Sequence, residues 1–308
     1  MPNLNPLIRD IEMALRPDPE RVKLARSRME SLVARIDKGA DRFDVRAIRP
    51  HGSLARGTAI RGFPDIDCLI VLDAQSRGIR RGDDPKNTIH ELRRWIEARH
   101  RGLVTLGHIV PRSQTHSVGV EYPGQGLRVD LVPALVRPGR GGHIYRIPSR
   151  EKQRWIHSNI GRFEALAKEA SPKTRAAIRL IKGWRRARGD NSGFSLPSYA
   201  IELMLLTAPR PANATAWLTV VRAFFERIAD AHMQRRLVLD ANDTGDPVSF
   251  SEPWTKENLL SGNDGAGRRA LIEKCRWTVD RLDAAAAAAT ARGASTILRS
   301  VFIPPEYR

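Results

Sequence analysis

Residues 66–72, IDCLIVL, form an almost continuous apolar run that is rich in branched side chains. A run of this length and composition is typical of a strand buried inside a sheet. Two acidic residues stand at its beginning, Asp65 and Asp67. Because a strand directs alternate side chains to the same face, we expect Asp65 and Asp67 to point together, while Ile66 and Cys68 point the other way. The run therefore predicts a buried strand that carries two carboxylates at one end.

A third acidic residue lies in a second apolar segment, LRVDLVPAL, where Asp130 is flanked by Val129 and Leu131. A charge inside an interior strand is costly unless it is paired or bound to a metal. Carboxylates that lie close together also repel each other unless a cation sits between them. Oxygen ligands without a companion His or Cys suit a hard cation, and Mg²⁺ together with phosphate is the usual case. Asp65, Asp67 and Asp130 are therefore candidate ligands whose carboxylates bridge two Mg²⁺ ions.

A glycine and a serine precede the acidic pair. Gly52 and Ser53 are separated from Asp65 by residues 54–64. Glycine permits a close approach of the backbone, and serine adds an N–H and a hydroxyl, which are groups that bind phosphate oxygens. No Walker-type loop ending in Gly-Lys-Ser/Thr is present. Gly52 and Ser53 are therefore candidates for holding the phosphates of a nucleotide.

Each of these motifs has a structural alternative when it is taken alone. An isolated Asp-x-Asp is common in loops and solvated pairs, and a single buried Asp130 is also typical of a hydrogen-bonded core acid. A Gly-Ser pair by itself indicates nothing. The order of Gly-Ser, then Asp-x-Asp on one strand, then Asp on a later strand is what favours a catalytic centre.

The charge balance points to a polyanionic ligand. The chain has 308 residues, with 52 Lys or Arg against 34 Asp or Glu, for a net charge of +18. Residues 101–200 alone carry much of the excess, so we expect this part to face nucleotide or nucleic acid. The alternative is a basic surface that serves solubility. Two cysteines are too few for a disulfide scaffold or a four-thiolate zinc site.

Hydrophobic periodicity predicts a mixed first half and a helical second half. Helices are expected over residues 18–38 and from 84 to about 100, and further strands over 45–48, 117–122 and 127–135. From about residue 149 the patterns favour helices, over the segments 149–170, 172–188, 197–207, 214–235 and 265–291. The fold class predicted is α+β, with a mixed β-sheet core in residues 1–150 and an α-helical lobe in residues 151–308. No apolar stretch reaches the ~18 residues of a spanning helix and no secretory signal is evident, so we expect a cytoplasmic protein that does not enter a membrane.

The motifs together resemble a known family. The segments HGSLARGTAIRGFPDIDCLIVLD and VDLVPAL resemble the Gly-Ser loop and the three acids of the nucleotidyltransferase superfamily. Within it, the chain is similar to the branch of 2′-5′ oligoadenylate synthases, cyclic GMP-AMP synthase and bacterial cyclic-oligonucleotide synthases of anti-phage signalling. IRLIKGWRR at 178–186 and GFSLPSYAIELM at 193–204 are similar to further family segments. The resemblance covers most of residues 45–207 and implies a two-lobed fold, with residues 1–150 as the catalytic core led by a spine helix and 151–308 closing the nucleotide cleft.

Residue roles follow from the resemblance position by position. It implies Asp65, Asp67 and Asp130 as ligands of Mg²⁺, with Asp130 also accepting the proton of the attacking hydroxyl. It implies that phosphate is bound by Gly52, Ser53, Lys182 and Ser198, and that Tyr199 stacks on a base. The alternatives are that Lys182 is one solvated charge in a basic run and that Tyr199 is core packing.

The resemblance implies a nucleotidyltransferase that makes cyclic, or in part linear, oligonucleotide second messengers from ATP and other nucleoside triphosphates (GTP, CTP or UTP). It also implies an effector protein that reads the product, and the basic middle third suits an RNA or another activator. One alternative is a template-independent RNA nucleotidyltransferase of the CCA-adding or poly(A)-adding type. Others are a nucleotidylyl-transferring antitoxin, which is usually much shorter, and a non-catalytic nucleic-acid-binding protein, which would gain nothing from three acids that repel phosphate.

Overall fold

The computed structural model describes most of the chain, and the statements below concern the described residues only. These are residues 3–37, 45–62, 65–72, 84–139, 142–150, 153–158, 160–188, 193–207, 217–230, 260 and 265–307. The chain divides into two compact units, of which one comprises Pro17–Lys168 and the other comprises Met1–Arg16 together with Glu169–Arg308. We call them the sheet unit and the helical unit. None of the helices in the described part has the length and hydropathy needed to cross a bilayer.

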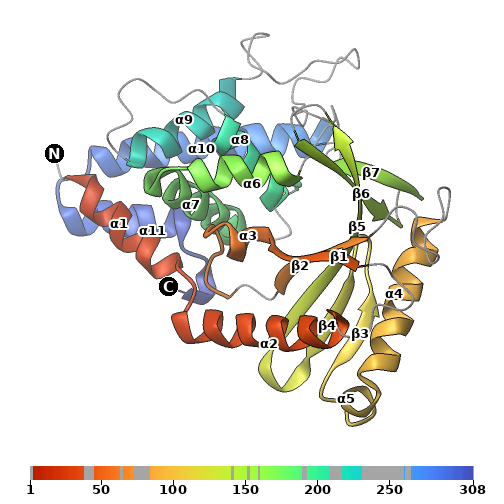
Figure 1. Cartoon of the computed structure of the whole chain (residues 1–308). Helices are drawn as coiled ribbons and strands as arrows, with labels where there is room; N and C mark the ends of the chain where they lie inside the picture. The colour runs from red at the N-terminus through yellow and green to blue at the C-terminus, as the bar shows by residue number, and fades with distance from the viewer. Residues whose placement is uncertain are drawn as a thin grey trace. The chain divides into compact units, whose positions relative to one another are not determined.

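The sheet unit is built on a seven-stranded mixed sheet, shown in Figure 1. The main order of its strands is β1-β2-β5-β4-β3, and β6 extends it by pairing with both β5 and β7. Strands β2 and β5 are parallel, and the other pairs are antiparallel. The strands are β1 (Val45–His51), β2 (Asp65–Leu72), β3 (Val110–Ser113), β4 (Val118–Tyr122), β5 (Leu127–Gly139), β6 (Gly142–Ser149) and β7 (Arg154–Ser158).

Helices cover one face of this sheet. Alternate residues of β2, from Ile66 to Leu72, pack with apolar side chains of α2 and α4 in the main core. The side chains of Asp18 and Asp84 cap the starts of these helices, since they accept hydrogen bonds from the backbone N–H groups of Glu20 and Lys86. The helices of this unit are α2 (Pro19–Asp37), α3 (Gly52–Ala55), α4 (Pro85–Arg99), α5 (Arg101–Thr105) and α6 (Ile160–Glu169), with a 3₁₀ turn η1 (Pro123–Gln125).

The opposite face of β2 carries the acids. Leu69 and Val71 belong to a second, smaller core cluster that includes Ile160 at the start of α6. Asp65 and Asp67 share this face by the alternation of the strand, and the burial pattern of β2 confirms that Ile66 and Cys68 turn into the main core. The predicted strand and its two faces are thus both observed.

The helical unit is held by large apolar side chains. Trp184 is fully buried, its ring lies 4.9 Å from that of Phe225, and its Nε1 donates a 2.8 Å hydrogen bond to Thr278. A Cβ on Gly183 would come within 2.6 Å of the carbonyl oxygen of Phe302, so glycine is what allows α7 to pack so closely. The elements of this unit are α1 (Leu4–Leu15), α7 (Pro172–Arg188), α8 (Ser198–Thr207), α9 (Trp217–Asp230), α10 (Gly265–Ala286), α11 (Ala291–Phe302) and η2 (Pro305–Tyr307).

Two expected helices are wrong over part of their length, and the one predicted over 265–291 ends at Ala286. The helix predicted over residues 149–170 begins only at Ile160, because β6 continues to Ser149 and β7 follows at Arg154–Ser158. Gln153 adopts a φ of 47° between these two strands, a reversal that single-sequence periodicity does not reveal. The predicted domain boundary at residue 150 also differs from the division into units, which places residues 1–16 with the later helices and 151–168 with the sheet. The assignment of these parts to catalysis and to cleft closure stays a prediction.

Candidate active site

The parallel pairing of β2 and β5 brings the three predicted acids together. Asp67 stands opposite Asp130 in the register of the two strands, and Asp65 stands opposite Arg128. The side chain of Asp130 is 9% exposed and that of Asp65 is 35% exposed. We call Asp65, Asp67 and Asp130 the acid cluster.

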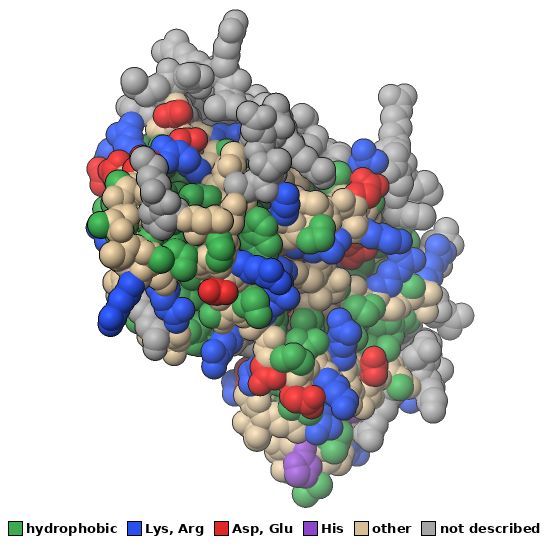
Figure 2. Space-filling view, turned by 90° about the vertical axis from the view of Figure 1, so that its left-hand side faces the viewer, with side chains coloured by type: hydrophobic (Ala, Val, Ile, Leu, Met, Phe, Trp, Pro, Cys, Tyr) green, Lys and Arg blue, Asp and Glu red, His purple; other side chains and the backbone are tan. Residues whose placement is uncertain are grey.

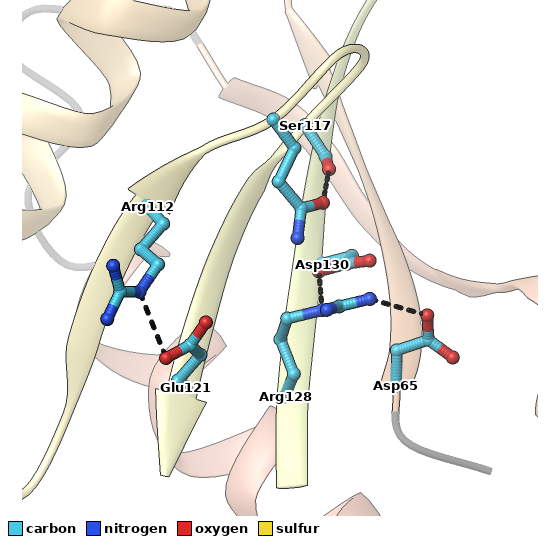
Figure 3. A network of polar contacts seen from close by, with 7 residues as sticks. Asp65, Arg112, Ser117, Glu121, Arg128 and Asp130 are labelled. Carbon is cyan, nitrogen blue, oxygen red and sulfur yellow. Dashed lines mark hydrogen bonds and ion pairs between the residues drawn. The ribbon is translucent and has the colours of Figure 1, made fainter. Parts of the chain in front are cut away.

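Arg128 joins two members of this cluster, as Figure 3 shows. Its Nε donates a 2.8 Å hydrogen bond to Oδ1 of Asp130, and its Nη2 donates a 2.8 Å hydrogen bond to Oδ2 of Asp65. This residue was not predicted from the sequence. The signal was available, because Arg128 precedes Asp130 by two positions and therefore shares its face of the strand.

The environment of Asp130 alters its acidity. Burial raises the pKa of Asp130 to about 6, while the charge of Arg128 lowers it and the charges of Asp65 and Asp67 raise it. In Arg128, burial lowers the pKa but the two carboxylates raise it by more, so the net shift is upward and the guanidinium stays charged. A carboxyl group with a pKa near neutrality can take up and release a proton at physiological pH. Asp130 is thus suited to act as a base.

The Gly-Ser turn lies directly against the acid cluster. Gly52 has a φ of 75°, and a Cβ there would stand 1.8 Å from Oδ2 of Asp67, so no other residue fits without a shift of the backbone or of the carboxylate. The carbonyl oxygen of Ser53 accepts hydrogen bonds from the backbone N–H groups of Thr58 (2.8 Å) and Ala59 (3.1 Å), which close the loop after α3. The structure therefore places Gly52 directly beside Asp67, with Ser53 as the next residue of the turn.

Two further residues that were not predicted from the sequence, His51 and Glu164, support this turn. His51 immediately precedes Gly52 and stands opposite Asp67 in the register of β1 and β2. Its Nδ1 lies 2.8 Å from Oε1 of Glu164 on α6. This contact ties the end of β1 to α6, and it joins residues too far apart in the sequence for any spacing rule to predict.

The donor set of the acid cluster suits a hard cation. In the described part of the chain, no group of three or more His, Cys, Asp or Glu side chains already surrounds a common point suitable for a metal ion. Instead, a guanidinium bridges Asp65 and Asp130, and this bridge shows that the cluster attracts positive charge. Carboxylate oxygens are the ligands that Mg²⁺ prefers. Asp65, Asp67 and Asp130 are therefore the residues that could hold such an ion.

The other predicted residues belong to the helical unit. Lys182 on α7 is 5% exposed, and its Nζ forms an ion pair with Oε1 of Glu202 on α8. Ser198 is the first residue of α8 and is exposed, and Tyr199 follows it and is partly buried. Lys182 is thus not a solvated charge in a basic run, and its contact with phosphate, like the roles of Ser198 and Tyr199, stays a prediction.

The ion pair between Lys182 and Glu202 leads to a stability prediction. In Lys182→Met, the Glu202 carboxylate stays buried without this cation, so we expect a loss of about 3 kcal/mol in the free energy of unfolding. The double variant Lys182→Met/Glu202→Met replaces both charges by apolar groups and should recover most of that loss. Urea unfolding of the three proteins measures both effects. Equal instability of the single and double variants would contradict the importance of this charge pair.

Known proteins share sequence and fold with this chain. A family model described as Second Messenger Oligonucleotide or Dinucleotide Synthetase domain matches residues 4–170. A cyclic AMP-AMP-AMP synthase of Escherichia coli (strain MS 115-1) is 27% identical in an alignment of 277 positions that covers 84% of this chain and 83% of that protein.

Solved structures are similar over nearly the whole chain. The structure of Escherichia coli MS115-1 CdnC with ATP has a TM-score of 0.78 at 22% identity and covers 97% of both chains. The structure of Bradyrhizobium diazoefficiens CdnG, described as a CD-NTase in complex with GTP, has a TM-score of 0.72 at 17% identity and covers 97% of this chain and 95% of that one. These similarities confirm the α+β nucleotidyltransferase fold expected from the sequence.

Proposed function

Because this chain belongs to the Second Messenger Oligonucleotide or Dinucleotide Synthetase family, we propose that it joins nucleoside triphosphates into cyclic oligonucleotides. In each step a ribose hydroxyl oxygen forms a bond to the α-phosphorus of a triphosphate. The bond from that phosphorus to the β-phosphate oxygen breaks, and pyrophosphate leaves. The observation that carries this proposal is the convergence of Asp65, Asp67 and Asp130 on one face of β2 and β5, beside the Gly52–Ser53 turn.

The acid cluster has two tasks in this reaction. The carboxylate of Asp130 takes the proton of the attacking hydroxyl. Asp65, Asp67 and Asp130 would hold two Mg²⁺ ions. When bound, these ions would neutralise the charge of the triphosphate and lower the pKa of the attacking hydroxyl. The work of the protein is mainly to position the reactants and neutralise their charge, and it needs no covalent intermediate.

Phosphate-binding roles are proposed for the Gly52–Ser53 turn and, in the helical unit, for Lys182 and Ser198. Gly52 allows the backbone to approach the phosphates closely, and Ser53 supplies an N–H and a hydroxyl. Lys182 contacts the β- or γ-phosphate once its Nζ exchanges the carboxylate of Glu202 for phosphate oxygens, and Ser198 adds a hydroxyl. Tyr199 stacks on a base. Stacking holds the base without contacts to its hydrogen-bonding edges.

ATP is the first candidate substrate and cyclic triadenylate the first candidate product. The support for this choice is the Escherichia coli relative, which is named a cyclic AMP-AMP-AMP synthase. GTP, CTP and UTP are the other substrates to test. The choice of base depends on a few side chains in the pocket, which the relative at 27% identity need not share.

The cellular role that we propose is anti-phage signalling in the cytoplasm, in which an effector protein reads the product. The basic composition supports an RNA or another polyanion as activator. On the face of the molecule shown in Figure 2, Lys and Arg side chains are spread widely. If RNA activates the enzyme through this charge, nuclease treatment should lower its activity and added RNA should restore it.

One incubation tests the proposed reaction. The protein is mixed with labelled ATP and Mg²⁺, with and without an RNA primer, and both pyrophosphate and nucleotide products are measured. We expect pyrophosphate release without a primer and a product that resists phosphatase, because a cyclic oligonucleotide has no terminal phosphate. The same reaction is repeated with GTP, CTP and UTP.

The incubation also separates the alternatives. A product that forms only when primer is present would favour an RNA nucleotidyltransferase. An absence of pyrophosphate with every triphosphate, with and without RNA, would favour a non-catalytic binding protein. Either result would overturn the proposed synthesis of cyclic oligonucleotides.

A further inference from the structure

We infer that Arg128 is a built-in counter-ion of the acid cluster, and that a divalent cation must displace its guanidinium in order to bind Asp65 and Asp130. This inference rests on the proposed function, because it takes the acid cluster as the metal site. It adds a residue that competes with the metal.

The contacts of Arg128 use carboxylate oxygens that could otherwise bind a metal ion. Its two hydrogen bonds reach carboxylates on different strands, Asp130 on β5 and Asp65 on β2, each at 2.8 Å. Such charge-assisted bonds are among the stronger hydrogen bonds in proteins. A guanidinium and a divalent cation repel each other, so binding both to these oxygens costs electrostatic free energy. Arg128 also reduces the charge of the three ionised carboxylates from −3 to −2, which weakens their attraction for a metal ion.

The side chain of Arg128 is partly exposed to solvent and can move away from the acid cluster. It is 30% exposed, whereas the side chain of Asp130 is only 9% exposed. A third carboxylate stands on its other side, because Glu121 of β4 lies opposite Arg128 in the register of β4 and β5. Directly opposed residues of an antiparallel pair share one face of the sheet and lie close together.

Glu121 can receive the displaced guanidinium. It is 35% exposed, and its Oε2 accepts a 3.0 Å hydrogen bond from Nε of Arg112, as Figure 3 shows. A carboxylate can accept from two guanidinium groups, because it has two oxygens and about four acceptor positions. Arg128 thus has two positions, one on the acid cluster without metal and one on Glu121 when metal is bound.

Binding of Mn²⁺ alone, without nucleotide, tests this competition. Free Mn²⁺ is measured by its paramagnetic resonance signal at pH 8. We expect Arg128→Gln to bind Mn²⁺ at least about tenfold more tightly than the wild type, because one nearby positive charge is removed. The matched control is Arg94→Gln on α4, which removes an exposed arginine whose partner is Glu91 and should leave the affinity unchanged.

The role of Glu121 is tested in the same titration. Glu121→Gln should weaken Mn²⁺ binding about twofold to fivefold, because the displaced guanidinium loses its second partner. In the Arg128→Gln background the same change should have no effect. An unchanged affinity of Glu121→Gln in the wild-type background would overturn the assignment of Glu121 as the receiving carboxylate.

If Arg128→Gln bound Mn²⁺ as tightly as the wild type or more weakly, the inference that Arg128 competes with the metal ion would be overturned. If this variant does not fold, the inference is tested on the wild type instead. The measurement is the Nε–H resonance of Arg128 in protein labelled with ¹⁵N-arginine. This resonance is identified by its absence from Arg128→Lys, and it should shift when Mg²⁺ is added, whereas an unchanged position would overturn the inference. Pyrophosphate release by the wild type is measured in parallel. Its absence would count against the proposed function alone, because Mn²⁺ binding needs no turnover.

Discussion

Replacement of Asp67 by asparagine should reduce pyrophosphate release by about 1000-fold or more and leave the fold intact. Asp67 stands opposite Asp130 on the neighbouring strand and beside Gly52, so its carboxylate is central to the acid cluster. Asparagine keeps the shape of the side chain but removes the charge needed to hold a divalent cation. The rate is measured at saturating ATP and Mg²⁺, and folding is checked by circular dichroism and urea unfolding.

The fold should tolerate this change because, without a metal ion, the negative charge of Asp67 repels that of Asp130. Its negative charge contributes to the raised pKa of Asp130, so its removal should lower that pKa. The control is Glu97→Gln on α4, which removes a partly exposed carboxylate paired with Arg93 in the same unit and should keep activity within about twofold. Retention of more than a tenth of the activity by Asp67→Asn would contradict the assignment of the acid cluster as the catalytic centre.

Local patterns predicted the part of the site that depends on a single strand. The alternation of residues 65–72 alone placed Asp65 and Asp67 on one face and Ile66 and Cys68 on the other, and the structure agrees. The apolar flanks of Asp130 likewise indicated an interior strand. Such features follow from the period of a strand, which does not depend on distant residues.

Contacts between elements could not be predicted in this way. The pairing of Lys182 with Glu202 depends on how α7 packs on α8, and that of His51 with Glu164 depends on how α6 lies against β1. Strand β7 forms because β6 offers it an edge to pair with. In each case the deciding interaction joins segments whose spacing in the sequence carries no periodic signal.

Asp130→Asn should abolish activity and, in the absence of divalent cations, stabilise the protein at pH 8. The pKa of Asp130 in the folded protein is about 6, which is above its value of about 3.9 in an unfolded chain. The folded state therefore prefers the protonated carboxyl. The stability that this preference contributes is fully present below about pH 4 and is lost as the pH rises through 6. Asparagine resembles the protonated carboxyl and does not titrate.

The difference in unfolding free energy between Asp130→Asn and the wild type should therefore depend on pH. A separation of roughly two pKa units corresponds to about 3 kcal/mol, so the advantage of the variant should grow by about 2 to 3 kcal/mol between pH 4 and pH 8. Urea unfolding at both pH values, with a chelator present, measures this growth. Addition of Mg²⁺ at pH 8 should reverse the order, because the ion stabilises only the protein that retains all three carboxylates. If the difference in unfolding free energy were the same at pH 4 and pH 8, the charge of Asp130 would be fully compensated in the folded protein. Mg²⁺ would then gain nothing by neutralising that charge.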